Sequence, residues 1–268
     1  MNKQKAFTLV ELLIVIAVIA ILMAILMPAL VKVREQGKRA VCLNNLRQLT
    51  VAWILYAHEN DDKIVNGAAG FSNVAGAPFY HGGERAWVGQ CWHPNYAQGQ
   101  QLPASQQRAE IMNGALWPYC KDVDAYRCPT GVPGELLTYA IMFSMNAVCY
   151  DVVKDVPNAF IKKRSEIYKP GPQHRLVFID EGWITPDAFA VHYDKEQWWD
   201  DPPVRHGDGV TVSFADGHME HWKWKGSDTI RIGRERVRGH SSNWTPTTPE
   251  GKEDLHRVQI GCWGRLGY

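Results

Sequence analysis

The hydropathy pattern divides the chain into a long apolar segment and a mixed remainder. Residues 12–31 form a run of twenty residues without a charge. An α-helix rises about 1.5 Å per residue, so this run gives roughly 30 Å of helix, enough to cross the hydrocarbon core of a bilayer. Lys3 and Lys5 precede the run, and positive flanks stay in the cytoplasm. We therefore expect a single-pass inner-membrane protein whose residues after 31 lie outside the cytoplasm.

The helix is predicted to continue past the membrane to about residue 60. Apolar residues there repeat at helical spacing, namely Cys42, Leu46, Leu49, Trp53 and Tyr56. Such a stripe indicates one buried face. Pro28 removes one helical hydrogen bond and is expected to kink the helix without ending it.

The pattern after residue 60 is typical of a globular α+β head over 61–225. It predicts a short helix over 110–121, an extended stretch over 136–148, a buried strand over 175–181 and a hairpin over 209–224. Asp216 and Gly217 indicate a type I′ turn in that hairpin. The expected fold class is thus α+β, with the long helix packed on an antiparallel β-sheet. Residues 226–268 form a C-terminal extension to which no fold is assigned.

Glu11 is a carboxylate inside the apolar segment. Insertion of such a group costs about 2.5–3.5 kcal/mol, so it indicates a function and a partner. Cleavage between Ala6 and Phe7 would create an amine four residues before Glu11, on the same helical face. An ordinary secretory signal has a shorter apolar region of about 7–15 residues, and a plain membrane anchor leaves Glu11 unexplained.

The segment Lys-Ala-Phe-Thr-Leu-Val-Glu at 5–11 resembles the start of type IV prepilins and type II secretion pseudopilins, with Ala6 where Gly is usual. The resemblance implies that prepilin peptidase removes the leader 1–6 after Ala6 and methylates Phe7. It also implies that the helix 7–60, with its spanning part 7–31, bundles with other copies or related pseudopilin subunits, and that Glu11 neutralises the Phe7 amine of the adjoining subunit. The head would face outward.

A second resemblance lies near the other end of the chain. His206, nine residues and then Asp216-Gly217 are similar to the H-x9-DG motif of a large group of pseudopilin-like proteins, and residues 42–49 and 126–129 resemble recurring segments of that group. Read from the residues alone, Asp216-Gly217 is turn chemistry and His206 caps or hydrogen-bonds the hairpin.

Metal binding is the alternative interpretation of these polar residues. Groups that could converge on a hard cation such as Ca²⁺ are Asp180, Glu181, His206, Asp208, Asp216 and His218, with Asp180, Glu181 and Asp216 as the metal candidates. Their spacing matches no dedicated calcium loop, so a structural role is favoured and no cofactor is expected. Zinc is disfavoured because the chain has no C-x2-C pair and no histidine at the usual spacing.

Six cysteines occur, at Cys42, Cys91, Cys120, Cys128, Cys149 and Cys262. Their even number in a head outside the cytoplasm makes disulfides possible, and a Cys120–Cys128 bond is the first candidate. Free buried thiols are the alternative.

Composition excludes several functions. The net charge is +1 and no basic block occurs beyond 32–39, so a nucleic-acid partner is not expected. No G-x-S-x-G, H-E-x-x-H or phosphate-binding glycine loop occurs, so the chain is not expected to be an enzyme. The eleven tryptophans leave a second function open, a non-polymerising membrane-tethered module that binds polysaccharide or protein through exposed rings. Packing of these rings in the core is favoured.

Overall fold

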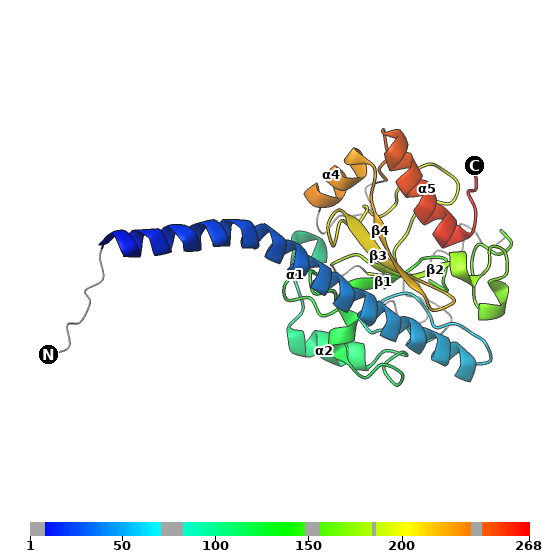
Figure 1. Ribbon diagram of the computed structural model, residues 1–268. Coiled ribbons are helices and arrows are strands. Elements are labelled where there is room, and N and C mark those ends of the chain that lie inside the picture. Colours follow the sequence, from blue (N-terminus) through cyan, green and yellow to red (C-terminus); the bar gives the residue numbers. More distant parts are fainter. Residues whose placement is uncertain (1–8, 71–82, 148–155, 184–185, 237–242) are drawn as a thin grey trace.

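The computed structural model describes residues 9–70, 83–147, 156–183, 186–236 and 243–268. The predictions made for Ala6, Phe7 and Cys149 lie outside the described residues. Figure 1 shows one long helix that projects from a head built around a small sheet.

The long helix α1 spans Leu9–Glu59, which confirms the expected architecture. It passes through Pro28 without ending. The first part extends away from the head and the second part lies across it (Figure 1). Asp61 and Asp62, with φ of 54° and 66°, turn the chain directly after the helix. Of the predicted stripe, Cys42, Leu46, Leu49 and Trp53 are fully buried, and Tyr56 is partly buried against the same core.

The head contains a four-stranded antiparallel sheet in the order β1-β2-β3-β4. Its strands are β1 (Tyr139–Ile141), β2 (Leu176–Asp180), β3 (Gly209–Phe214) and β4 (Met219–Lys223). The second part of α1 packs against β2, β3 and β4. The predicted strand over 175–181 and the hairpin are therefore confirmed, whereas the extended stretch over 136–148 contributes only three residues to the sheet.

The short helix lies earlier than predicted. Helix α2 spans Ala104–Met112, so the expected helix over 110–121 is wrong in its position. Directly after the helix, a Cβ at Gly114 would come within 2.1 Å of the Trp87 carbonyl oxygen. The backbone of Gly114 must pass close to Trp87, and the chain continues from there in turns. Single 3-10 turns lie at Tyr96–Gln98, Val123–Tyr126, Arg164–Glu166 and Pro172–His174.

The turn of the hairpin differs from the predicted type. Gly217 donates its backbone N–H to the Phe214 carbonyl over 2.9 Å, and Phe214 donates to the His218 carbonyl over 3.0 Å. Gly217 has a positive φ of 98°, whereas the φ of Asp216 is not positive. A type I′ turn needs two such residues, so the connection is a type I turn over Ala215 and Asp216 followed by a glycine bulge.

The C-terminal residues form two helices, α4 (Ser227–Glu235) and α5 (Pro249–Trp263). Leu255, Val258 and Cys262 of α5 are fully buried in the common core. The buried guanidinium of Arg175 donates 2.8 Å to the Cys262 carbonyl, and it also donates to the carbonyls of Asn158 and Ala159. The extension is thus packed against β2 as part of the head.

Candidate functional site

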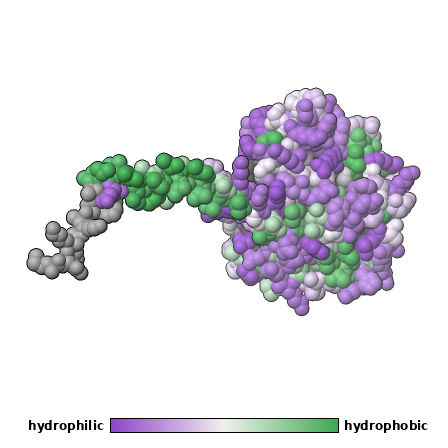
Figure 2. All heavy atoms as spheres, viewed as in Figure 1, coloured by the Kyte–Doolittle hydropathy of each residue, from purple (hydrophilic) through white to green (hydrophobic). Residues whose placement is uncertain are grey.

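The first part of α1, residues 9–33, presents apolar side chains on all sides. The exposed fraction of its large apolar residues ranges from 45% for Ile19 to 78% for Leu9. Figure 2 shows this part as an almost continuous hydrophobic rod outside a mostly hydrophilic head. Within the part of the chain that the structure describes, α1 is the one helix long and apolar enough to cross a membrane. We call residues 9–33 the exposed half of α1.

Glu11 lies in the first turn of α1, where a carboxylate interacts favourably with the positive end of the helix dipole. Its side chain is exposed on the apolar rod. The cleavage and methylation residues Ala6 and Phe7 lie outside the described residues, so their roles stay predictions.

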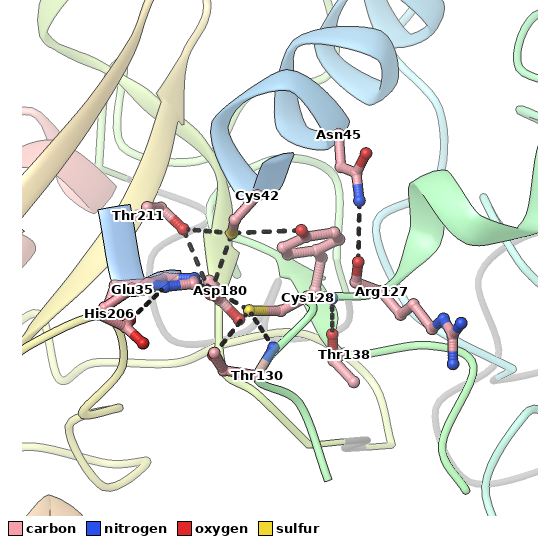
Figure 3. Close-up of polar contacts among 11 residues, drawn as sticks. Glu35, Cys42, Asn45, Arg127, Cys128, Thr130, Thr138, Asp180, His206 and Thr211 are labelled. Atoms are coloured by element: carbon pink, nitrogen blue, oxygen red, sulfur yellow. Dashed lines mark hydrogen bonds and ion pairs between the residues drawn. The ribbon is translucent and has the colours of Figure 1, made fainter. Parts of the chain in front are cut away.

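A second candidate site is buried where α1 meets the sheet. It consists of Cys42 from α1, Cys128 from the loop after the 3-10 turn at Val123–Tyr126, Asp180 at the end of β2 and His206 from the loop before β3. One side-chain atom of each residue lies within 4.8 Å of the others. We call these four residues the buried cluster, and Figure 3 shows how they point toward one another.

Short contacts join the members of the buried cluster. The Cys42 thiol donates to Asp180 Oδ2 over 3.1 Å. His206 Nε2 lies 3.1 Å from Cys128 Sγ and 3.5 Å from Asp180 Oδ2. The side chains of His206 and Asp180 are completely inaccessible to solvent. The other ring nitrogen of His206 contacts Glu35 of α1, with 3.0 Å between Nδ1 and Oε1 (Figure 3).

Hydroxyl and backbone groups surround the sulfur atoms. Tyr139 donates its hydroxyl to Cys42 Sγ over 3.2 Å, and Thr211 Oγ1 lies 2.9 Å from the same sulfur. Thr130 donates its backbone N–H to Cys128 Sγ over 3.4 Å. Asp180 Oδ1 is buried and has no hydrogen-bond partner among the described residues.

The proximity of these groups shifts their pKa values. Burial acts to lower the pKa of His206, but hydrogen bonds to Asp180 and Cys128 outweigh it and raise that pKa to about 10. Burial acts to raise the pKa of Cys128, but hydrogen bonds from Cys42 and His206 lower it to about 7. Burial raises the pKa of Cys42 well above its usual range. The contacts in the buried cluster thus favour the charged form of the His206 imidazole and the ionised form of the Cys128 thiol.

The predicted metal candidates separate in the fold. Asp180 joins His206, whereas Asp216 lies at the tip of the hairpin with its Oδ1 2.6 Å from Nδ1 of His218. His206 and Asp216 flank the six residues of β3, a strand roughly 20 Å long, so the two ends of the H-x9-DG motif lie far apart. Glu181 is buried, neither of its oxygens has a hydrogen-bond partner among the described residues, and burial raises its pKa well above the usual range.

The Cys120–Cys128 disulfide is not formed. Both residues are free cysteines, as are the buried Cys42, Cys91 and Cys262. Cys128 Sγ points to His206 and to the hydroxyl of Thr130, 3.1 Å from each. The structure therefore does not pair Cys120 with Cys128, and the Cys128 side chain belongs to the buried cluster instead.

The tryptophans pack in the head. Seven of the eleven are buried, namely Trp53, Trp87, Trp183, Trp198, Trp222, Trp224 and Trp263. The other four, Trp92, Trp117, Trp199 and Trp244, are partly buried against the same core. An exposed stacking platform for sugars would need rings that face solvent, and these rings do not supply one.

Sequence reasoning missed the buried cluster as a unit. Its four residues come from four separate segments, and Cys42 and Asp180 are 138 residues apart in the chain. A C-x2-C pair and a histidine at the usual spacing are ligands close together in sequence, so their absence does not exclude a site built from distant segments. The available signal was that Cys42, Cys128 and His206 each belong to a segment with the second family resemblance.

Known proteins are similar to part of the chain. Residues 1–27 match the family model described as the prokaryotic N-terminal methylation motif. Over 69 residues the chain is 41% identical to the type IV wide pilus major component PilA4 of Thermus thermophilus. These aligned residues make up 26% of this chain and 53% of the relative. The chain thus spans about half the length of this curated relative. No solved structure matches the chain. Residues 1–27 therefore carry the prokaryotic N-terminal methylation motif, and the matched 69 residues are similar to a type IV pilus component.

Proposed function

We propose that the chain is the subunit of an extracytoplasmic filament, a type IV-like pilus or a type II secretion pseudopilus. Prepilin peptidase cleaves it after Ala6 and methylates Phe7, and the mature subunit assembles through α1 with other copies or related subunits. The observation that carries the proposal is the exposed half of α1, which is apolar on all sides and packs against no other part of the described chain.

The exposed half requires an apolar environment at every stage. Burial of a Val, Leu, Ile or Met side chain stabilises by about 1.5–3 kcal/mol, so the residues between Leu9 and Val33 represent tens of kcal/mol. A bilayer supplies this environment before assembly, and the single-pass orientation leaves the head outside the cytoplasm. After extraction from the bilayer, the same surface is covered by the corresponding helices of neighbouring subunits.

Glu11 sets the register of this assembly. A carboxylate in an apolar bundle is stabilised by an opposite charge, and the mature Phe7 amine of an adjoining subunit provides one. The description of the relative in Thermus thermophilus as a pilus component supports a filament role. Assembly by α1 needs no catalytic group, so the head is free to face cargo, surface or other subunits.

Mass spectrometry of the mature amino terminus, from membranes of the native host, tests the proposal. It predicts a chain that begins with methylated Phe7. An intact Met1 would contradict processing and would favour a membrane-tethered binding module. Cleavage further along the chain would contradict it as well, because it would indicate an ordinary secreted protein.

A further inference from the structure

We propose that the buried cluster is a structural zinc site in which Cys42, Cys128, Asp180 and His206 are the four ligands. This inference is independent of filament assembly, because it concerns the head alone. The donor set, two sulfurs, one imidazole nitrogen and one carboxylate oxygen, is of the kind that binds Zn²⁺ in four-coordinate tetrahedral sites.

The distances suit a shared ion. Zinc binds sulfur at about 2.3 Å, and nitrogen or oxygen at about 2.0–2.2 Å, so tetrahedral ligand atoms lie roughly 3.3–3.8 Å apart. The donor atoms of the buried cluster lie within 4.8 Å of one another, and the closest pairs are 3.1–3.5 Å apart. Small side-chain movements would thus seat one ion among them.

The surroundings match those of bound zinc. A histidine ligand usually donates its second ring N–H to a carboxylate, which fixes the tautomer and the ring orientation. Glu35 Oε1 lies 3.0 Å from His206 Nδ1, which leaves Nε2 to face the cluster. Hydroxyl and backbone donors from Tyr139 and Thr130 point at the two sulfurs, as expected around thiolate ligands.

Asp180 has one buried oxygen without a partner among the described residues. Asp180 is completely buried, yet its Oδ1 has no hydrogen-bond partner within the described chain. Burial of a carboxylate without compensating partners is costly, and a cation bound at the neighbouring Oδ2 would offset that cost through its charge. Cys128 also lines a surface cleft beside Asn45 and Arg127, which offers the ion a route into the site.

A Cys42–Cys128 disulfide is the competing use of the same sulfurs. It would consume only the two thiols and would leave Asp180 and His206 as a buried pair. Zinc coordination uses all four groups at once and also accounts for Glu35. We therefore favour the ion, and the test below separates the two.

Zinc at this position would fasten the head to α1. The ion would join α1, the Cys128 loop, the end of β2 and the loop before β3, and Cys128 and His206 alone are 78 positions apart in the chain. Because a site of this kind does not exist in the unfolded chain, the free energy of zinc binding stabilises the fold.

The experiment uses the full chain in detergent, stripped with a chelator, incubated with Zn²⁺ and dialysed. Elemental analysis should find about one zinc per chain. Cys128→Ser and His206→Gln should lose zinc at the same free concentration. Cys91→Ser is the matched control, since it removes a buried thiol outside the cluster and should retain the ion. Glu35→Gln should weaken zinc binding by about 10–100-fold.

Cobalt binding to the wild-type chain tests the proposed zinc site even if a variant fails to fold. Co²⁺ added to the stripped wild-type chain should give a thiolate-to-cobalt charge-transfer band, and Zn²⁺ should abolish the band. The proposal is overturned if the wild-type chain binds neither metal while its thiols stay free. It is also overturned if the mass is lower by two hydrogen atoms and peptides containing Cys42 and Cys128 are linked.

Discussion

The two halves of α1 are continuous in backbone but opposite in environment. In the exposed half, the large apolar side chains between Leu9 and Val33 are at least 45% exposed. In the second half, Cys42, Leu46, Leu49 and Trp53 are fully buried against the sheet. One helix thus belongs to two structures, the head of its own chain and an apolar environment outside it.

The difference shows what each pattern encodes. A stripe at helical spacing is buried by the chain itself, because the sheet covers only one face. An apolar surface on all sides cannot be covered by one sheet face and indicates lipid or neighbouring helices. Glu35 lies two residues after the exposed half and contacts His206 of the head, so α1 begins to contact the head at about this residue.

The largest expected effect is the difference in lost stability between a truncation in the second half of α1 and a truncation in the exposed half. Trp53→Ala removes a fully buried ring and should lower the free energy of unfolding of the head by about 3–5 kcal/mol. Leu22→Ala truncates a residue that is 54% exposed, and should change head stability by less than about 0.5 kcal/mol. Chemical denaturation of the full chain in detergent measures both. Equal losses would contradict the division of α1.

A pH dependence should belong to the head, with buried Asp200 and buried Glu181 both contributing to it. Burial raises the pKa of Asp200 to about 7; the backbone N–H of Ala190 opposes the shift and the charge of Asp201 adds to it. The unfolded pKa is about 3.9, so the neutral acid stabilises the fold fully below about pH 4. This contribution, up to about 4 kcal/mol, is lost as the pH rises toward 7.

Asp200→Asn tests this assignment, because an amide stays neutral and can still accept the 2.6 Å hydrogen bond from Ala190. Denaturation at pH 4 and pH 8 should show a smaller loss of stability in the variant than in the wild type. A variant with the same pH dependence as the wild type would remove Asp200 as a source of it.

A charge in the exposed half should weaken insertion of α1 into the membrane without changing the fold of the head. Leu22→Lys places an ammonium near the middle of the apolar run and should cost about 2.5–3.5 kcal/mol of insertion. Carbonate extraction should release more of this variant from membranes than of Leu22→Ala. The near-ultraviolet circular dichroism of the head should stay unchanged, and loss of that signal would show that the exposed half also supports the head.

Local patterns predicted the parts of the fold that local physics controls. The apolar run, the stripe from Cys42 to Trp53 and the alternation in β3 gave α1, its buried face and the hairpin. The position of α2 was missed because the buried apolar residues Ala115 and Leu116 lie in turns after the helix, where burial does not require a helical backbone. The hairpin turn was misjudged because Asp216 adopts negative φ, which its residue type permits.

The candidate sites differ in the same way. The proposed processing segment is contiguous, so roles for Ala6, Phe7 and Glu11 could be predicted from sequence, and all three lie within the residues 1–27 that match the methylation-motif family model. In the buried cluster, His206 and Asp180 were each singled out, but only the pairing of β2 with β3 and the packing of α1 bring them beside Cys42 and Cys128.

The exposed half of α1 as an assembly surface is tested most directly by comparing filaments from cells that produce the wild-type chain or Glu11→Ala. Both chains should insert into the membrane and carry a folded head. The account predicts that wild-type chains appear in the sheared filament fraction, while Glu11→Ala stays in the membrane fraction. Equal amounts of the two chains in filaments would contradict it.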